Sequence, residues 1–253
     1  MRRAMVLLLT LLALGCAPRN KVIEEMPAWR TEEGKRTLRH ELVESLIDSG
    51  ATQEALLLIA QMREEGESDP VLDLYHGQAL AREGFAAESE RMLLQYRKSA
   101  PRDARPLKTL GVIYAESERT PEAIAILRKA VALDDGDATA WNNLGFLLLS
   151  EKQYPEAQEA LQQAVALNGS EARYRNNLGF ALAANGHYRE AFEAFQSIGA
   201  PEMAHHNVGV AYELAGDQAA AVRHYEQALE YNPNHTASME AIERLESVEE
   251  ENE

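Results

Sequence analysis

Four glycines spaced 34 residues apart constrain the fold of this 253-residue chain more than any other feature. Gly77, Gly111, Gly145 and Gly179 keep this interval, and Gly209 follows after 30 residues. A period of this size is typical of a solenoid, in which each repeat is one small structural unit that stacks on its neighbours. The sequence therefore predicts a linear array of units and not the single core of a globular enzyme.

Two further positions recur in phase with the glycines. With the glycine at position 8, the repeats lie at 36–69, 70–103, 104–137, 138–171, a shortened 172–201 and 202–235. The first copy is degenerate, because Val43 replaces its glycine. Position 20, where two helices of a repeat are expected to cross closely, is always small: Ala55, Ser89, Ala123, Ala157, Ala191 and Ala221. Position 24 is always apolar: Ile59, Leu93, Leu127, Leu161, Phe195 and Tyr225. We expect position 24 to bury against the first helix of the next repeat, so that the core is one continuous stripe.

This pattern resembles the tetratricopeptide repeat (TPR), W-x2-L-G-x2-Y…A-x3-F…P. The copy at 138–171 shows it most plainly, with Trp141, Leu144, Gly145, Leu148, Ala157, Leu161 and Ala164. The resemblance implies an all-α TPR superhelical solenoid of about six helix-turn-helix repeats. The abundance of alanine and leucine and the low aromatic content of 6% agree with an all-α array.

The turn inside each repeat follows the same phase. Gly50, Gly84, Gly186 and Gly216 stand where a left-handed residue would end the first helix. Two copies carry Glu118 and Lys152 there, so we expect less typical turns at those places.

The segment 236–253 follows the last repeat and predicts a capping helix with a frayed acidic tail. Met239, Ile242, Leu245 and Val248 recur at helical spacing before a run of glutamates. Such a helix would cover the apolar face that the last repeat otherwise exposes.

The N-terminus has the layout of a secretory signal, with Arg2-Arg3, an apolar run over 4–14 and small residues before Cys16. The apolar run is too short to cross a bilayer as a helix. Residues 13–16, Ala-Leu-Gly-Cys, resemble a bacterial lipobox, although the family usually has leucine where this chain has Ala13. The resemblance implies a signal peptide over 1–15, a covalent diacylglycerol or acyl lipid on Cys16, and a lipidated tether over 16–35.

Cys16 also has a plainer interpretation, as an unmodified residue of an ordinary signal peptide. It is the single cysteine of the chain and has no partner for a disulfide, which favours lipidation. In lipoproteins of this kind an aspartate after the cysteine commonly retains the protein in the inner membrane. Because Ala17 follows here, the resemblance implies the outer membrane of a Gram-negative bacterium, facing the periplasm.

The charge balance restricts the partners. The chain has 25 basic and 41 acidic residues, a formal net charge of −16. Loss of the signal removes Arg2 and Arg3, which leaves 23 against 41, or −18. Such a charge argues against nucleic acid and against electrostatic attraction to anionic lipid, so membrane attachment would come from acyl chains.

No catalytic or metal-binding constellation stands out, and we predict no enzyme activity, no metal and no bound cofactor. His205 and His206 are adjacent, so on a helix they point to different faces and cannot share a metal as an i, i+4 pair does. The other histidines, including His76, His187, His224 and His235, are scattered over different repeats and are interpreted as surface or packing residues. An enzyme remains the alternative of a different class, and turnover in an assay panel would support it.

The concave face of the predicted solenoid is the candidate binding site. In this fold it is lined by positions 2, 5, 6, 9, 12 and 13 of each first helix. The predicted groove residues are Arg105, Lys108, Val112, Asn142, Asn143, Phe146, Arg173, Asn176, Asn177, Phe180, His206, Asn207 and Val210. Asparagine offers a donor and an acceptor to a peptide backbone, and Phe146 and Phe180 would be apolar anchors. The alternative is that the amides repeat a family preference and the two phenylalanines pack within the array.

The shortened repeat 172–201 ends four residues earlier than its neighbours, in Ser197-Ile198-Gly199-Ala200-Pro201. Its second helix must therefore stop early. Either this is neutral variation in a loop, or it changes the curvature of the groove around a particular partner.

An exported, lipidated array of six TPRs resembles the pilotin-type lipoproteins of type IV pilus systems and the Tad (Flp) pilus lipoproteins. The resemblance implies a protein-binding scaffold at the outer membrane that helps a secretin or pilus complex to assemble or localise. The rival within the same class is a TPR adaptor that recruits peptidoglycan hydrolases or another periplasmic complex.

Overall fold

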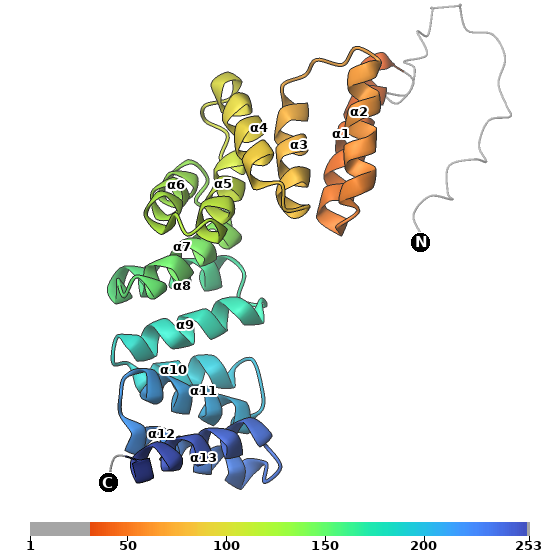
Figure 1. Cartoon of the computed structure of the whole chain (residues 1–253). Coiled ribbons are helices and arrows are strands. Elements are labelled where there is room, and N and C mark those ends of the chain that lie inside the picture. The colour runs from red at the N-terminus through yellow and green to blue at the C-terminus, as the bar shows by residue number, and fades with distance from the viewer. Residues whose placement is uncertain (1–30, 252–253) are drawn as a thin grey trace, which may run out of the picture. The chain divides into compact units, whose positions relative to one another are not determined.

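The computed structural model describes residues 31–251, and every regular element in that range is an α-helix (Figure 1). The helices are α1 (Glu32–Ser49), α2 (Thr52–Glu64), α3 (Val71–Arg82), α4 (Ala86–Ser99), α5 (Arg105–Glu116), α6 (Thr120–Leu133), α7 (Ala138–Ser150), α8 (Tyr154–Leu167), α9 (Ala172–Ala184), α10 (Tyr188–Gln196), α11 (Pro201–Leu214), α12 (Gln218–Tyr231) and α13 (Thr236–Glu251). The predicted all-α class is confirmed. The signal peptide, Cys16 and the first part of the tether lie outside the described residues.

Contacts divide the chain into two units, one ending at Leu42 and one running from Val43 onward. The described part of the first unit is the beginning of α1. That helix starts at Glu32, so it includes the last four residues of the segment 16–35 that we predicted to be the lipidated tether.

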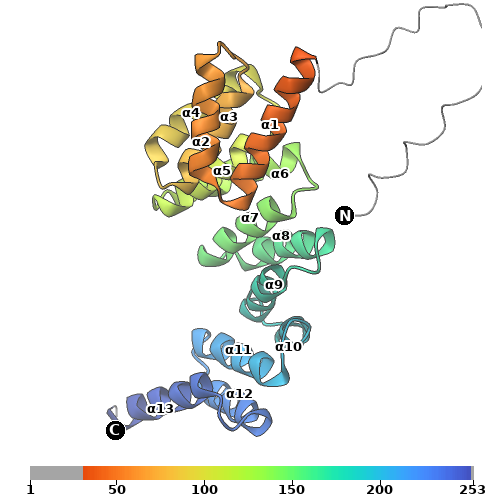
Figure 2. The same cartoon turned by 90° about the vertical axis from the view of Figure 1, so that its right-hand side faces the viewer.

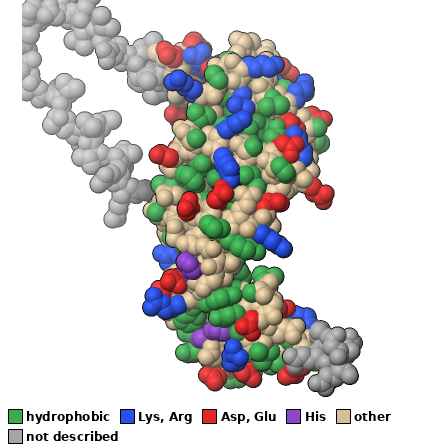
Figure 3. Space-filling view, turned by 90° about the vertical axis from the view of Figure 1, so that its left-hand side faces the viewer, with side chains coloured by type: hydrophobic (Ala, Val, Ile, Leu, Met, Phe, Trp, Pro, Cys, Tyr) green, Lys and Arg blue, Asp and Glu red, His purple; other side chains and the backbone are tan. Residues whose placement is uncertain are grey.

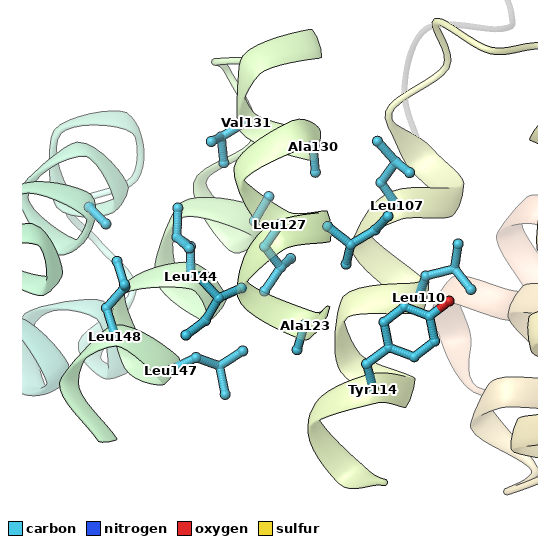
Figure 4. Packing of buried hydrophobic residues seen from close by; sticks show 14 of the residues in the cluster. Leu107, Leu110, Tyr114, Ala123, Leu127, Ala130, Val131, Leu144, Leu147 and Leu148 are labelled. Atoms are coloured by element: carbon cyan, nitrogen blue, oxygen red, sulfur yellow. The ribbon is translucent and has the colours of Figure 1, made fainter. Parts of the chain in front are cut away.

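The second unit is a succession of helical hairpins. Each predicted repeat interval contains one helix pair, from α1/α2 to α11/α12, and the pairs follow one another in chain order (Figures 1 and 2). First helices of successive repeats also contact each other from α3 through α11. Figure 4 shows this packing where α5, α6 and α7 meet, with Leu107 and Leu110 facing Leu127, and Leu144 and Leu148 continuing the layer.

The repeated glycine is explained by the side chain at position 24. A Cβ added to Gly145 would lie 2.5 Å from Cγ of Leu161, and one added to Gly179 would lie 2.4 Å from Cε1 of Phe195. Such distances are too short for a carbon atom, so the second helix can approach only a glycine. This contact lies within one repeat, between position 8 of the first helix and position 24 of the second.

Position 20 is small for the reason expected, since it lies at the crossing of the two helices. Ala123 and Ala157 are completely buried. The exception in composition, Ser89, is also completely buried and donates a 2.6 Å hydrogen bond from Oγ to the carbonyl oxygen of Gly77. The hydroxyl is tolerated there because it has an acceptor.

The buried residues form four successive clusters along the array. They cover residues 43–79, 74–181, 182–211 and 221–245. Val71, Leu178 and Tyr212 are half-buried, and each packs against two neighbouring clusters. These three side chains are here called the joints.

In every turn inside a repeat, one residue has a positive φ angle. The φ angles of Gly50, Gly84, Gly186 and Gly216 lie between 82° and 84°. Glu118 and Lys152 also adopt positive φ, 59° in both cases. Their turns are therefore of the same kind as the others, whereas we had expected less typical turns at these two places. The local fold imposes a left-handed residue even where the sequence supplies a side chain.

The short repeat has a short second helix, as predicted. α10 has 9 residues, against 14 in α4, α6, α8 and α12. The carbonyl oxygen of Ser197, just after α10, accepts a 3.1 Å hydrogen bond from Nη1 of Arg175 on α9. The first helix of this repeat therefore satisfies a backbone group at the early end of the second.

α13 packs on α12 as a capping helix. Its buried face is Ser238, Ala241 and Leu245, with Ile242 half-buried. Met239, at 37% exposed, is covered less completely than these residues. The helix continues through Glu251 into the acidic run that we had expected to fray. Over residues 31–251, no helix combines the length and the apolar character that a membrane crossing requires.

Candidate protein-binding groove

An open cavity of about 510 Å³ lies along the first helices of four repeats. All of its lining residues come from α1, α3, α5 and α7: Glu44, Ile47, Asp48, Gln78, Ala81, Arg82, Arg105, Lys108, Thr109, Val112, Ile113, Glu116, Thr139 and Asn143. Four predicted groove residues meet here, namely Arg105, Lys108, Val112 and Asn143. The other nine predicted residues do not line this cavity.

The two cations of α5 are already paired with carboxylates. Nζ of Lys108 lies 2.6 Å from Oδ2 of Asp137, whose Oδ1 also caps α7 by accepting from the N–H of Ala140 at 3.0 Å. Nη2 of Arg105 donates to Oδ2 of Asp103 at 2.6 Å. Both cations remain partly exposed at the cavity, but they enter it as ion pairs and not as free positive charges.

The Arg105 pair forms a small network with Tyr96. Hydrogen bonding to Asp103 raises the pKa of Arg105, and despite its burial the pKa of Asp103 is lowered by the hydrogen bonds from Arg105 and Tyr96. The hydroxyl of Tyr96 donates to Oδ2 of Asp103 at 2.6 Å. Burial, together with this bond, raises the pKa of Tyr96 to about 12. The groove wall is therefore charged but internally neutralised at this point.

Most of the predicted amides are used to join repeats. Nδ2 of Asn177 donates to Oδ1 of Asn142 at 2.9 Å, and Nδ2 of Asn207 donates to Oδ1 of Asn176 at 3.2 Å. Asn142 is only 2% exposed. The amide at position 5 of one repeat thus accepts a hydrogen bond from the amide at position 6 of the next repeat. Asn142 is therefore a structural residue and not a ligand-binding one. Asn143, in the cavity, accepts only a long 3.4 Å bond from Asn142.

The two phenylalanines differ in exposure. Phe146 is 53% exposed, and Val112, at the same repeat position on α5, is 38% exposed. Phe180 is half-buried and makes an edge-to-face contact with Phe195, with ring centroids 5.0 Å apart. The structure therefore leaves Phe146 as an apolar surface residue and places Phe180 in the packing of its own repeat.

The C-terminal predicted residues contact other elements. Arg173 is exposed, and its guanidinium carbon lies 5.5 Å from the ring centroid of Tyr174. Val210 is half-buried against the cluster of α12 and α13. Nδ1 of His206 lies 3.0 Å from Oγ of Ser238 on α13, and burial lowers the pKa of His206. His206 and Val210 thus help to dock the capping helix.

Sequence reasoning missed the N-terminal wall of the cavity. Glu44 and Gln78 occupy position 9 of the first two repeats, and Asp48 and Arg82 occupy position 13. The rule that selected the other groove residues also selects these four. Positions 9 and 13 of the first two repeats therefore carry the same sequence signal as the predicted groove residues of the later repeats.

Comparisons with known proteins agree with this architecture. Three family models described as tetratricopeptide repeat match residues 74–138, 114–179 and 203–235. The solved structure of MamA is 30% identical, with a TM-score of 0.52, and the match covers 64% of this chain and 96% of that one. The chain belongs to the tetratricopeptide repeat family.

Two further solved structures share the fold of this TPR protein at lower identity. YrrB, described as a TPR protein with an unusual peptide-binding site, is 22% identical with a TM-score of 0.61, and the match covers 72% of this chain and 96% of YrrB. PilF of Pseudomonas aeruginosa is 19% identical with a TM-score of 0.61, covering 81% of this chain and 95% of PilF. A search of curated protein sequences returned no match. TPR arrays of this kind are typically non-enzymatic and bind protein partners.

Proposed function

We propose that this TPR protein is a non-enzymatic scaffold whose groove captures a polypeptide segment of an envelope assembly partner. The main support is the cavity of about 510 Å³, which is formed only by the first helices of the repeats. Val112 lies on its wall, and the exposed Phe146 lies one repeat further on. An apolar pair of this kind in successive repeats offers anchors that the core does not need.

The chemistry of the groove fits a chain segment with mixed character. Val112 on the cavity wall and exposed Phe146 one repeat further on take apolar side chains, while Thr109 and Asn143 offer a hydroxyl and an amide to its backbone. The three cations of the cavity are paired, Arg105 with Asp103, Lys108 with Asp137 and Arg82 with Asp48, so an acidic segment meets no unpaired cation there.

We further propose that acyl chains on Cys16 hold the scaffold at the outer membrane, facing the periplasm, where the partner is a secretin or pilus component. The support is the lipobox-like sequence together with the TPR array, a layout shared with pilotin-type lipoproteins. The fold likeness to PilF over 95% of its length is compatible with this assignment. Confinement at the membrane would raise the effective concentration of the partner.

The test begins with a pull-down from solubilised outer membranes and continues with the identified partner in purified form. Phe146→Ser should weaken its affinity by about tenfold, or about 1.4 kcal/mol, with the melting temperature unchanged. Leu57→Ser is the matched control, since Leu57 is 72% exposed on the second helix α2, outside the groove. Phe180→Ser should instead lower the melting temperature.

Equal affinity of wild type and Phe146→Ser for the partner would reject Phe146 as an anchor and, with it, the apolar pair on which the proposed binding site depends. Capture of a peptidoglycan hydrolase through Phe146, in place of a pilus or secretin component, would keep the groove and transfer the assignment to the adaptor alternative.

A further inference from the structure

Four of the seven histidines of the chain gather at its C-terminal end, in two pairs. His205 and His206 lie on α11, and their partners are His224 on α12 and His235 in the turn before α13. Figure 3 shows histidine side chains at the surface of this end of the molecule, among apolar groups. Because adjacent helix residues face different sides, each α11 histidine meets a different histidine, although His206 also contacts Tyr225 on α12, with ring centroids 5.4 Å apart.

The first pair is His205 and His224. Their Nδ1 atoms are 3.3 Å apart, and their rings lie with centroids at 5.5 Å and an angle of 29°. The pair belongs to a stack of rings in which Phe192 and Tyr231 lie against His205, and Tyr212 lies against His224. The stack ties α11 to both α10 and α12.

The second pair is His206 and His235, with ring centroids 5.1 Å apart. Oγ of the fully buried Ser238 lies 3.0 Å from Nδ1 of His206 and 2.9 Å from Nδ1 of His235. A hydroxyl has one hydrogen, so it donates to one ring and accepts from the other. The pair fixes α11 against the start of α13.

In both pairs, uptake of a first additional proton disturbs the hydrogen bonds less than uptake of a second. In the first pair one Nδ1 must carry a hydrogen and the other must accept it, so protonation of the accepting atom breaks the bond and sets two N–H groups against each other. In the second pair, two charged rings 5.1 Å apart would repel, and the buried Ser238 hydroxyl would lose its acceptor.

The surrounding charges do not remove this restriction. Glu230 is the carboxylate that favours the charged form of His205, while Arg223 opposes it at His224. Glu213 favours a charged His206 but is already bonded to Arg244 at 2.8 Å and to the hydroxyl of Tyr225 at 2.8 Å. Burial lowers the pKa of His205, His206 and His224 below 6.5.

We propose that α11, α12 and α13 form a pH-responsive end of the array, which takes up its full complement of protons only when these helices separate. With the hydrogen bonds of the two pairs formed, the end is closed. As the pH falls through the ordinary histidine range, the separated state binds more protons than the packed one, so its population rises. Stability of this end is therefore present above that range and lost below it.

Hydrogen exchange of the full chain, in buffers with a chelator, tests the proposal at pH 7.5 and 5.5. After correction for intrinsic rates, peptides from α11–α13 should open more at the lower pH, by up to about tenfold per pH unit for each extra proton taken up. Peptides from α5–α8 are the internal reference and should change little. Equal loss of protection in both regions, or no loss in either, would overturn the proposal.

Variants separate the histidines from other acid effects. The double variant His224→Gln with His235→Gln keeps hydrogen-bonding side chains that do not titrate, and it should remove most of the pH dependence of α11–α13. His187→Gln, at an exposed position in the α9–α10 turn, is the matched control and should leave it unchanged. Full pH dependence in the double variant would contradict the assignment.

A second measurement covers the case in which the variant does not fold. NMR titration of the wild-type chain should show His205, His206 and His224 taking up protons at lower pH than an isolated histidine. Ordinary titration of all three residues would refute the proposal. The cavity is lined by α1, α3, α5 and α7 and not by α11–α13, so neither measurement depends on the proposed function.

Discussion

At the scale of single residues, the same backbone position is filled by glycine in four repeats and by a charged side chain in two. Glu118 and Lys152 adopt φ of 59°, a region in which a Cβ crowds the following carbonyl. Their turns nevertheless make the same hydrogen bonds, as the 2.8 Å bond from the N–H of Arg119 to the oxygen of Tyr114 shows. The repeat geometry thus stabilises a strained residue.

We expect Glu118→Gly and Lys152→Gly each to raise the free energy of unfolding by about 0.5–1 kcal/mol, because relief of left-handed strain exceeds the entropy that glycine adds to the unfolded chain. Urea denaturation followed by circular dichroism measures this. Gly84→Ala, at the equivalent position with φ of 83°, should have the opposite sign. A loss of stability in both glycine variants would show that the side chains contribute more than the backbone strain costs.

At the scale of helices, caps and ion pairs connect one repeat to the next. Asp137 caps α7 and also pairs with Lys108 on α5, whereas Asp217 caps α12 through the N–H of Ala220 at 2.9 Å and has no ion pair in the described structure. Both aspartates are N-caps, but only Asp137 also connects the first helices of two repeats.

Asp217→Ala should cost about 1 kcal/mol of unfolding free energy, the usual value of an N-cap. Asp137→Ala should cost the same plus a few tenths, up to about 1 kcal/mol, for a partly exposed ion pair. The difference should shrink in 1 M salt, which screens the pair but not the cap. If Asp137→Ala is no worse than Asp217→Ala at low salt, the Lys108 pair contributes nothing.

The helices and turns were predictable because local spacing determines them. Glycine at position 8, alanine at position 20 and the early end of α10 can all be read from one sequence with a fixed period. The fate of the groove side chains could not be read in this way. Whether Asn142 faces a ligand or Asn177, and whether Phe180 faces solvent or Phe195, depends on how closely neighbouring helices pack.

The histidines show the same limit more clearly. His205 and His224 are 19 residues apart, and His206 and Ser238 are 32 apart, so no short-range pattern connects them. The interpretation that His224 and His235 are surface or packing residues was right about packing, but it missed that each histidine packs against another.

At the scale of the whole molecule, the proposed function needs both the array and an attachment to the membrane. Cys16→Ala should release the protein from the membrane fraction with its helicity unchanged, because the hydrophobic contribution of the acyl chains, about 0.8 kcal/mol per buried CH₂, is lost. Fractionation and circular dichroism measure the two quantities. Ala17→Asp is the matched variant, which keeps the lipid and should move the protein to the inner membrane. Cys16→Ala retained in the membrane pellet would contradict lipid anchoring.

The joints at Val71, Leu178 and Tyr212 have a mechanical consequence. Bending within a cluster would pull fully buried side chains apart, whereas bending at a joint shifts a side chain that is already half in water. The free-energy cost of bending is therefore lower at these three places than at a contact between fully buried side chains, because less apolar area becomes wetted. We expect changes in the curvature of the array to occur preferentially there.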